Sequence, residues 1–464
     1  MTTETDLTRE ALIEAGLFDP DWYRAQYPDV AEAGMTPLDH FLTIGIALRR
    51  DPGPDFSETF MQLAVPRLTA DGPTALEQRL KNATLAPAKP RVMMGAQALA
   101  ENGRLEDAVR QSRRHLGERA DGPLRIMAAN AALDRGSRSE WLTQLNLYLA
   151  QFPIAPVMLR SARSLFQQLA TRSIRNISGG PLVSIIMPAW NAEAHIRAAA
   201  NSILQQSWTN LELLIVDDAS SDGTWRVLQN LAAEDDRVRI HRNSRNLGPY
   251  VCKNFALREA RGAYVTGQDA DDWSHPQRIE RHVTHFLKTG GEIKAGTTMM
   301  LRMSPEGRFA NIIPTSAHHS PDGIRRRSFI SCMFEREFMV GQLCNYDPVR
   351  FGADGEMLSR ARCLLGEAYR DHDEIGMLCL DRAGGLTNHP VYGLRTRQAG
   401  SSLRETYVSA YRQWHEQAQP AGLRIDGFAA SRAFPAPAEM VVPPAEIGVE
   451  AGRQIFPSKS DKDD

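Results

Sequence analysis

Apolar and polar positions alternate in a regular order from about residue 181 onward. Short runs rich in valine, isoleucine and leucine predict β-strands, and amphipathic stretches between them predict α-helices. The predicted strands are 182–190, 211–220, 238–244 and 263–272, and the predicted helices are 196–206, 224–234 and 250–260. Strands that alternate with helices form a mostly parallel sheet with helices on both faces. The pattern therefore predicts an α/β fold for this part of the chain.

The pattern before residue 176 is helical. Residues 17–56 contain short helical patterns that proline and aspartate turns interrupt, and residues 88–170 are rich in alanine, leucine and arginine. Gly103 and Gly136 lie at equivalent turns about 33 residues apart, which is the period of tetratricopeptide-like helix pairs. An ordinary helical bundle with a coincidental spacing explains the same pattern, so both alternatives stay open.

The length of the chain requires more than one domain, because a single domain holds roughly 100–200 residues. The predicted boundaries follow the changes of pattern: a short helical module at 1–87, a helical segment at 88–175, the α/β domain at 176–434 and a flexible tail at 435–464. The tail contains "PAPAEMVVPPAEIG" and "PSKSDKDD", which offer too little apolar area to compensate for the entropy of ordering.

Composition and charge exclude several classes of protein. A net charge of -2 gives no basic field that would attract nucleic acid. The five cysteines are odd in number and form no CxxC pair, so we expect a reducing compartment and neither a disulfide framework nor a zinc knuckle. The amino terminus has no basic region followed by an apolar stretch, and no run of about 18 apolar residues occurs. We expect a cytoplasmic protein without a transmembrane segment, and peripheral attachment to the inner face of the membrane stays open.

Three carboxylates crowd the end of the last predicted strand, in "GQDADDWSHP". Asp269, Asp271 and Asp272 repel one another at this spacing, and a divalent cation is the usual reason to hold such groups together. Mg²⁺ and Mn²⁺ prefer one or two carboxylates together with the phosphate oxygens of a substrate. We therefore expect Asp269 and Asp271 to hold Mn²⁺ or Mg²⁺ jointly with a diphosphate, with Asp272 in a supporting role. A solvated acidic turn that caps the next helix is the alternative.

Two further polar clusters follow the first two predicted strands. Ligands of parallel α/β sheets bind beyond the carboxyl ends of the strands. The first cluster offers a flat aromatic ring and backbone groups to a planar base, and the second offers carboxylate acceptors to a base or a ribose. The members are Pro188, Ala189, Trp190, Asn191 and Glu193 after the first strand, and Asp217 and Asp218 after the second. Core packing of Trp190 and helix capping by Asn191 are the simpler alternatives.

Four segments together resemble glycosyltransferase family 2, whose members have the GT-A fold. "VSIIMPAWN" is similar to the opening strand of the family, "IVDDASSDGT" to its second strand, "NLGPYVCKN" to its "NxGxxxARN" helix and "GAYVTGQDADD" to its DxD strand. Residues 17–56 separately resemble a short module found beside bacterial polysaccharide glycosyltransferases. The resemblance implies a nucleotide-sugar donor and a divalent metal.

The resemblance also implies a role for each matching residue. Pro188, Trp190 and Asp218 are expected to contact the nucleotide base, and Lys253 to approach the base or the diphosphate. Asp269 and Asp271 are expected to hold the ribose and the metal. The full set expected to bind the donor is Pro188, Ala189, Trp190, Asn191, Glu193, Asp218, Lys253, Asp269 and Ala270, with Asp217 in support. Lys253 replaces the usual arginine of the family, and Gln268 stands where an apolar residue is more usual.

The segment "YDPVRFGADGEMLSRAR" contains Asp354, Glu356 and Arg360 in the pattern D-x-E-x-x-x-R. This pattern is similar to the acceptor-side element of the family, which implies that Asp354 is the general base and that Arg360 steadies the neighbouring carboxylates. A base is needed because the pKa of an acceptor hydroxyl lies far above 7. Glu356 as the base, and a surface helix with an i,i+4 charge pair, are the alternatives.

The segment 392–403 is similar to the loop that closes over the donor in relatives. Arg397 and Gln398 stand there where many relatives have a histidine, and His389 is an alternative source of a further metal ligand. We predict a single inverting transfer of a sugar from a nucleotide-sugar donor of the UDP-sugar class to a hydroxyl of a glycan or glycolipid in bacterial surface-polysaccharide synthesis.

Two other functions compete with this prediction. A nucleotidyltransferase would need a glycine-rich, basic phosphate loop, which "MPAWNAEAH" does not supply. A non-catalytic scaffold would combine an inactive transferase domain with helices that bind partners. The amino-terminal helices are the candidate contact surface for a protein partner under either interpretation.

Overall fold

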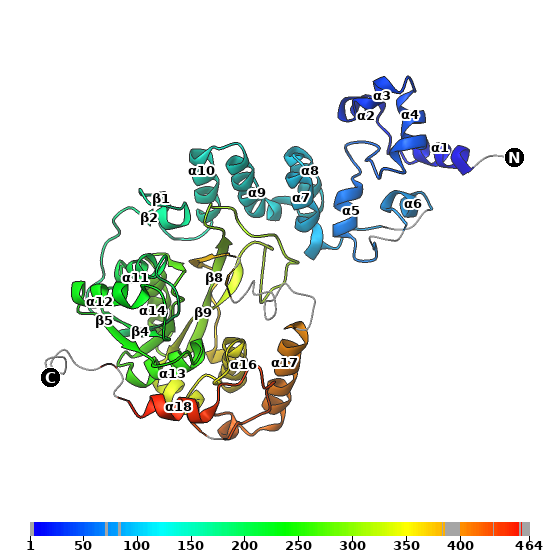
Figure 1. Ribbon diagram of the computed structural model, residues 1–464. Coiled ribbons are helices and arrows are strands. Elements are labelled where there is room, and N and C mark those ends of the chain that lie inside the picture. The colour runs from blue at the N-terminus through cyan, green and yellow to red at the C-terminus, as the bar shows by residue number, and fades with distance from the viewer. Residues whose placement is uncertain are drawn as a thin grey trace. The chain divides into compact units, whose positions relative to one another are not determined.

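The computed structural model describes residues 4–69, 73–81, 85–382, 384–385, 400–429, 431–453 and 456 (Figure 1). The chain divides into two compact units that interleave in sequence. Unit 1 comprises Met1–Gln151 and Asn311–Arg326, and unit 2 comprises Phe152–Ala310 and Arg327–Asp464. The hydrophobic pattern assigns residues 311–326 to the α/β domain, so their place in unit 1 corrects the predicted boundaries.

Short helices form the first part of unit 1, drawn in blue in Figure 1. They are α1 (Glu4–Glu14), α2 (Pro20–Gln26), α3 (Asp29–Glu32), α4 (Pro37–His40), the π-helical turn η1 (Phe41–Gly45), α5 (Glu58–Ala64) and α6 (Ala75–Leu80). Four of these helices begin at a side chain that accepts a backbone N–H, namely Asp19, Thr36, Ser57 and Thr74. The buried rings of Tyr23 and Phe41 meet edge to face with their centroids 5.4 Å apart, and they fix the core of this module.

Two pairs of helices follow in unit 1. A 3₁₀ turn, η2 (Lys89–Arg91), leads into α7 (Val92–Glu101) and α8 (Leu105–Leu116), and η3 (Gly117–Ala120) leads into α9 (Asp121–Asp134) and α10 (Arg138–Leu149). Within each pair the helices pack against each other. Gly103 and Gly136 occupy the two matching turns with φ of 76° and 73°, a conformation that favours glycine. The assignment of these pairs to a tetratricopeptide-like repeat stays a prediction.

Residues 311–326 pack against these helices inside unit 1. The backbone N–H of Ile312 donates to Oε1 of Gln97 at 2.6 Å, and that of Thr315 donates to the carbonyl of Pro90 at 2.8 Å. The hydroxyl of Tyr148 donates to Asp322 at 2.7 Å. Polar contacts between residues more than 170 positions apart leave no periodic signature, which is why the sequence pattern does not reveal them.

Unit 2 contains an eight-stranded sheet with the order β5-β4-β3-β6-β9-β8-β10-β7. The strands are β3 (Val183–Ala189), β4 (Leu211–Asp217), β5 (Val238–Arg242), β6 (Tyr264–Gly267), β7 (Trp273–Ser274), β8 (Ala295–Met303), β9 (Arg326–Glu335) and β10 (Ile375–Leu380). β3 to β6 run parallel, as do β8 and β10, whereas β9 is antiparallel to β6 and β7 to β10. A small sheet pairs β1 (Val157–Leu159) with β2 (Leu169–Thr171), with η4 (Phe166–Gln168) between them.

Helices cover both faces of this sheet, which confirms the predicted α/β class. Along β3, Ile185 and Met187 join one apolar cluster and Ile186 joins the other, because successive side chains point to opposite faces. The longer helices are α11 (Ile196–Leu204), α12 (Thr224–Glu234), α13 (Pro249–Glu259), α14 (Arg278–Lys288), α16 (Ala353–Leu365), α17 (Gly400–Gln417) and α18 (Pro444–Ala451). The shorter elements are α15 (Arg336–Phe338), η5 (Met339–Leu343), η6 (Gly366–Ala368) and η8 (Pro420–Gly422).

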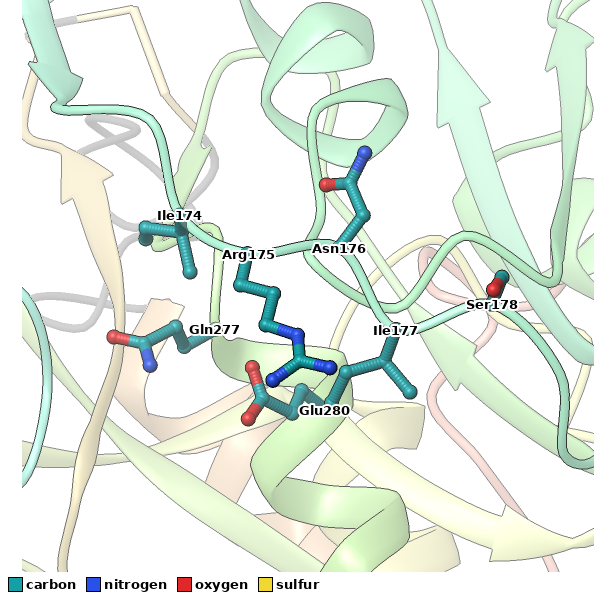
Figure 2. A pocket seen from close by; sticks show the side chains of 7 residues that line it. All are labelled: Ile174, Arg175, Asn176, Ile177, Ser178, Gln277 and Glu280. Carbon is teal, nitrogen blue, oxygen red and sulfur yellow. The ribbon is translucent and has the colours of Figure 1, made fainter.

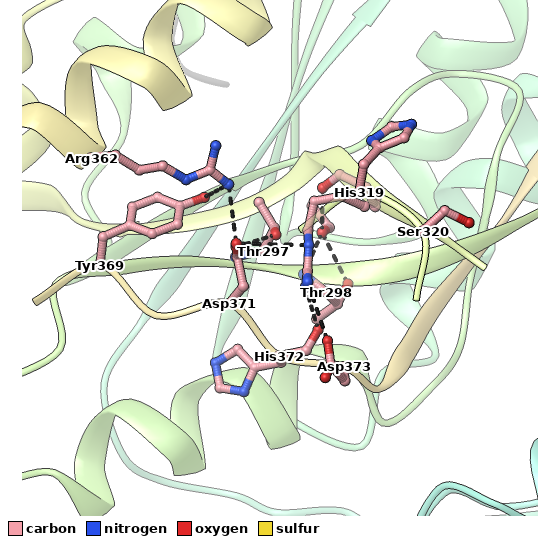
Figure 3. Close-up of polar contacts among 12 residues, drawn as sticks. Thr297, Thr298, His319, Ser320, Arg362, Tyr369, Asp371, His372 and Asp373 are labelled. Atoms are coloured by element: carbon pink, nitrogen blue, oxygen red, sulfur yellow. Dashed lines mark hydrogen bonds and ion pairs between the residues drawn. The ribbon is translucent and has the colours of Figure 1, made fainter. Parts of the chain in front are cut away.

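A polar network fixes the connection from α16 to β10 (Figure 3). Asp371 accepts hydrogen bonds from the backbone N–H of Thr297 at 3.2 Å and from Arg362 at 3.0 Å. The buried side chain of Arg327 donates to the carbonyl of His372 at 2.8 Å. These contacts anchor the start of β10, whose far end reaches the cluster of aspartates described below.

The predicted tail is wrong for residues 435–453. Met440, Val442 and Ile447 are buried in the same apolar cluster as α13. Glu450 accepts hydrogen bonds from the backbone N–H and the hydroxyl of Ser244, at 3.1 and 2.6 Å. Widely spaced apolar anchors between prolines are enough to dock this segment, although its average composition resembles a linker. None of the helices in the described ranges combines the length and the apolar character that crossing a membrane requires.

Candidate active site

Polar side chains gather where β3, β4 and β6 end and where α16 begins; we call this region the rim. At the end of β6, the buried amide of Gln268 donates to the carbonyls of Asp272 and Asp269 at 2.9 and 3.3 Å. Its Oε1 accepts a hydrogen bond from Ser274 at 2.7 Å. Gln268 therefore holds the turn that carries the three aspartates, which explains why a polar residue replaces the usual apolar one.

The three aspartates of this turn differ in their surroundings. Asp272 is buried and accepts a hydrogen bond from the backbone N–H of Leu380 at 2.8 Å, and burial raises its pKa well above the usual range. It ties the turn to β10. Asp271 is partly exposed and receives a 2.9 Å hydrogen bond from Nε of Arg382. Arg382 lies outside the sequence motifs, so no local pattern indicates its contact with Asp271.

Charges of both signs act on the carboxyl group of Asp269. Desolvation raises its pKa most, Lys253 lowers it, and the negative charges of Asp271 and Asp354 raise it further. Asp354, in the first turn of α16, accepts a hydrogen bond from the hydroxyl of Tyr250 at 2.8 Å, and Nζ of Lys253 lies 4.9 Å from the ring of the same tyrosine. Asp269 and Asp271 thus lie on one turn, and the charge of Asp354, the third of these residues selected from the sequence, acts on Asp269.

Lys253 lies in α13 and is almost completely buried. Its Nζ is 4.9 Å from the ring centroid of Tyr250 and 5.4 Å from that of Tyr346. An ammonium over aromatic faces is stabilised by the ring quadrupoles, so the two rings favour this position of the Lys253 side chain. Its position fits a cation of the donor site, and direct contact with a base or a diphosphate stays a prediction.

The end of β3 presents the expected aromatic ring. Trp190 is 57% exposed, which excludes the alternative of core packing. Asn191 has a φ of 46° and does not cap α11; its backbone N–H donates to the hydroxyl of Ser220, and its Oδ1 accepts from the backbone N–H of Ser221 at 2.8 Å. These bonds join the loop after β3 to the loop after β4. The side chain of Ala270 is buried in the apolar cluster, so only its backbone is left for a donor.

Asp217 and Asp218 are both buried at the end of β4. Asp218 accepts hydrogen bonds from Asn243 at 2.8 Å and from the backbone N–H groups of Leu247 and Gly248 at 2.8 and 2.7 Å. Burial raises the pKa of Asp218, and these hydrogen bonds oppose the rise. Asp218 therefore fixes the loop that starts α13, and its predicted contact with the base or ribose remains untested.

Asp217 and Glu193 also have protein partners. Asp217 accepts from the backbone N–H of Ser220 at 3.2 Å and lies 3.1 Å from Nε of Arg242. Glu193 accepts from the backbone N–H of Gly223 at 3.0 Å and pairs with Arg226 at 3.1 Å, so it stabilises the start of α12. The predicted contact between Glu193 and a donor has no support in this geometry.

Glu356 and Arg360 lie on the buried side of α16, so the alternative of a surface charge pair is wrong. Arg360 binds both oxygens of Glu356 at 2.9 and 3.1 Å, and it donates to the carbonyls of Leu343 and Asn345 at 2.6 and 2.8 Å. Nε2 of His415 lies 3.0 Å from Glu356. We call Glu356, Arg360 and His415 the clamp. His415 was missed because nothing in its sequence neighbourhood links α17 to α16.

The donor atoms at the rim fit a divalent metal that a substrate shares. Among the described residues, no group of three or more His, Cys, Asp or Glu side chains could hold a metal ion as a closed site. Asp269 and Asp271 would supply two hard carboxylate ligands, which suits a cation that completes its shell with phosphate oxygens and water. The segment that contains His389, Arg397 and Gln398 lies outside the described residues.

A cavity of about 500 Å³ lies elsewhere in unit 2 (Figure 2). Residues 174–178 and two residues at the start of α14, Gln277 and Glu280, line it, and Arg175 extends toward Glu280 in the view. None of the residues selected from the sequence lines this cavity. The candidate site is therefore the rim and not this cavity.

Comparison with known proteins identifies the family of the central part of the chain. Residues 184–330 match the family model described as Glycosyl transferase family 2. The chain is 37% identical over 140 residues to EpsE of Bacillus subtilis (strain 168), named as a glycosyltransferase, with 30% of this chain and 50% of EpsE covered. It is 39% identical over 108 residues to WfgD of Escherichia coli, a UDP-Glc:alpha-D-GlcNAc-diphosphoundecaprenol beta-1,3-glucosyltransferase, with 23% of this chain and 42% of WfgD covered.

A solved structure also aligns with the chain. The structure of S. aureus TarS 1-349 in complex with UDP-GlcNAc covers 44% of this chain and 59% of its own, at 17% identity and a TM-score of 0.33. The chain spans about half the length, or less, of the curated relatives named here. Residues 184–330 thus form a glycosyltransferase family 2 domain, which confirms the family expected from the four motifs.

Proposed function

We propose that the protein transfers a sugar from a nucleotide-sugar donor, of the UDP-sugar class, to a hydroxyl of a glycan or glycolipid in the synthesis of a bacterial surface polysaccharide. The observation that carries this proposal is the turn after β6, which Gln268 holds and which carries Asp269 and Asp271 within the residues that match family 2. The similarity to WfgD, which is named as a UDP-glucose-dependent transferase with a lipid-linked acceptor, supports the proposed classes of donor and acceptor.

In this proposal Asp269 and Asp271 hold Mn²⁺ or Mg²⁺ together with the donor diphosphate. When bound, the metal stabilises the negative charge of the departing nucleoside diphosphate. Arg382 donates a hydrogen bond to Oδ2 of Asp271 in the structure. This hydrogen bond must break before that oxygen can bind a metal ion. Lys253 adds positive charge on the buried side of Asp269, where it favours the ionised carboxylate.

Asp354 is the general base in this proposal. The acceptor oxygen forms a bond to the anomeric carbon, its proton passes to the Asp354 carboxylate, and the bond to the diphosphate oxygen breaks with its electron pair leaving on the diphosphate. Attack from the face opposite the leaving group inverts the anomeric configuration. Glu356 is excluded as the base in this proposal because both of its oxygens bind Arg360 in the buried clamp.

The remaining rim residues would bind the nucleoside. Trp190 offers an exposed ring for stacking on a planar base, and Pro188 and Asn191 shape the loop beside it. Cytoplasmic location is part of the proposal, since all five cysteines are free. The helical pairs of unit 1 are proposed to position the acceptor or a protein partner.

Thermal unfolding of the full chain with a panel of nucleotide sugars tests this function. A donor at 100 times its Kd should stabilise the protein by roughly 2.7 kcal/mol in Mn²⁺, and the stabilisation should disappear in chelator. Release of the nucleoside diphosphate with a lipid-linked or oligosaccharide acceptor would then identify the reaction. Equal stabilisation in chelator and in Mn²⁺, or none from any nucleotide sugar, would contradict the proposal.

A further inference from the structure

Tyr250, at a variable position of the segment "NLGPYVCKN", contacts the proposed base directly. The hydroxyl of Tyr250 donates to Oδ1 of Asp354 at 2.8 Å and accepts a hydrogen bond from the backbone N–H of Gly352 at 3.2 Å. Tyr250 is buried, and burial raises the pKa of its phenol well above the usual range. The phenol therefore keeps its proton at neutral pH, where it donates to Asp354.

The backbone around Tyr250 is held firmly. Tyr250 is the second residue of α13, and Asp218 fixes the preceding loop through the backbone N–H groups of Leu247 and Gly248. Pro249 occupies the first position of the helix, where its fixed φ suits the helical conformation. The position of the phenol oxygen therefore depends on the fold and not on a mobile side chain.

The two carboxylate oxygens of Asp354 differ in their hydrogen-bond partners. Oδ1 accepts from Tyr250 and also from the backbone N–H of Gly355 at 3.0 Å. Oδ2 accepts no hydrogen bond from the part of the chain that the structure describes. One oxygen is thus fixed by the protein, and the other is left to accept a proton from a substrate.

Tyr346 provides a matched comparison on the other side of Lys253. The rings of Tyr250 and Tyr346 stack with centroids 5.8 Å apart, and Lys253 lies over both. The side chain of Asn254 binds the backbone N–H and carbonyl of Tyr346 at 2.8 and 2.9 Å, so its backbone is equally fixed. The two tyrosines differ in that only the Tyr250 hydroxyl contacts Asp354 among the described residues.

We propose that Tyr250 is a positioning residue, which holds Oδ1 of Asp354 so that Oδ2 accepts the proton of the acceptor hydroxyl. The inference rests on the proposed function, in which Asp354 is the base. Tyr250 does not exchange its own proton in the reaction; its hydrogen bond orients the carboxylate of Asp354.

The test compares Tyr250→Phe with Tyr346→Phe in the full-length protein. Both substitutions keep the ring and its contact with Lys253, and each removes one hydroxyl. Tyr250→Phe should lower kcat by about 10- to 100-fold, the range for loss of a hydrogen bond to a charged group, with KM for the donor unchanged. Tyr346→Phe should stay within about twofold of the wild type in both measurements.

A double substitution separates positioning from general support of the fold. In an Asp354→Asn background, Tyr250→Phe should reduce kcat no further, because the tyrosine acts through the carboxylate. Independent, multiplicative losses would overturn the inference, as would equal kinetics of the two Phe variants in an active enzyme. Absence of sugar transfer by the wild-type protein would instead contradict the proposed function itself, so the two failures are distinguishable.

Discussion

The rim and the clamp both contain carboxylates of α16, but their charges are balanced in different ways. In the clamp, Glu356 is fully buried and receives two hydrogen bonds from Arg360. At the rim, desolvation raises the pKa of Asp269 most, and the charges of Asp271 and Asp354 raise it further against the opposing effect of Lys253. A carboxylate with a complete set of partners stabilises the fold, whereas a crowded group of carboxylates is suited to binding a cation or a proton.

This difference decides between two acids that lie two positions apart. The pattern D-x-E-x-x-x-R alone offers both Asp354 and Glu356 as bases. Burial and hydrogen bonding assign Glu356 to the clamp and leave Asp354 with one oxygen that no described protein group occupies. We therefore expect substitutions at the rim to reduce activity and substitutions in the clamp to reduce stability.

Loss of a metal ligand at the rim should have the largest effect. Asp271→Ala should reduce turnover by on the order of 10³-fold or more, because the diphosphate would leave without the charge stabilisation that the metal supplies. Calorimetric titration of UDP in Mn²⁺ should show a matching loss of affinity. Asp272→Asn is the control: its amide oxygen can still accept from Leu380, so metal-dependent UDP binding should persist. Full activity of Asp271→Ala would show that Asp271 is not a metal ligand.

A change in the clamp should affect stability instead. Arg360→Met leaves Glu356 buried without its partner and two carbonyls without a donor, which should lower the free energy of unfolding by about 3–5 kcal/mol. Arg362→Met on the same helix removes a partly exposed ion pair and should cost roughly 1 kcal/mol or less. Urea unfolding of unit 2 measures both. Similar midpoints for the two variants would show that the clamp does not hold α16.

Replacement of the buried lysine, Lys253, should have a smaller effect, which appears in KM for the donor. Lys253→Met removes the positive charge beside Asp269 and should raise KM for the donor by about tenfold, the effect of roughly 1.4 kcal/mol. Lys253→Arg restores the residue usual in the family and should stay within about threefold of the wild type. Equal KM values for the wild type and Lys253→Met would show that Lys253 does not contribute to donor binding.

Removal of the amino-terminal helices should change the chemistry least. A chain that begins at Phe152 keeps all rim and clamp residues, so its donor-dependent thermal stabilisation in Mn²⁺ should match that of the full chain. Residues 311–326 lose their contacts with Gln97 and Tyr148 in this truncation, so deletion of that segment should improve its solubility. A folded truncation that no longer binds the donor would place part of the site in unit 1.

Much of the rim could be predicted from sequence because its residues follow strands whose carboxyl ends meet at one edge. The order of strands and helices predicted that edge, and the DxD turn and Asp354 were recognised within short motifs. Contacts that join distant segments could not be predicted this way. Arg382 on Asp271 and Tyr250 on Asp354 each connect residues more than 100 positions apart, and no local pattern encodes such a pair.

The errors have a common physical origin. The tail was predicted from average composition, yet a few apolar anchors such as Met440 and Val442 are enough to dock it. Residues 311–326 were assigned by their position between two strands, although their hydrogen bonds lie in unit 1. A surface role was an alternative for Glu356 and Arg360 because i,i+4 spacing describes a buried pair and an exposed pair equally well.

The central claim is that Asp354 removes the acceptor proton, and turnover of Asp354→Asn with saturating donor and the true acceptor tests it most directly. The account predicts a loss on the order of 10²–10⁴-fold with donor affinity nearly unchanged, because only proton removal is impaired. Glu356→Gln, measured per folded protein, should keep turnover close to that of the wild type. Near wild-type turnover of Asp354→Asn, or a larger loss in Glu356→Gln than in Asp354→Asn, would contradict the account.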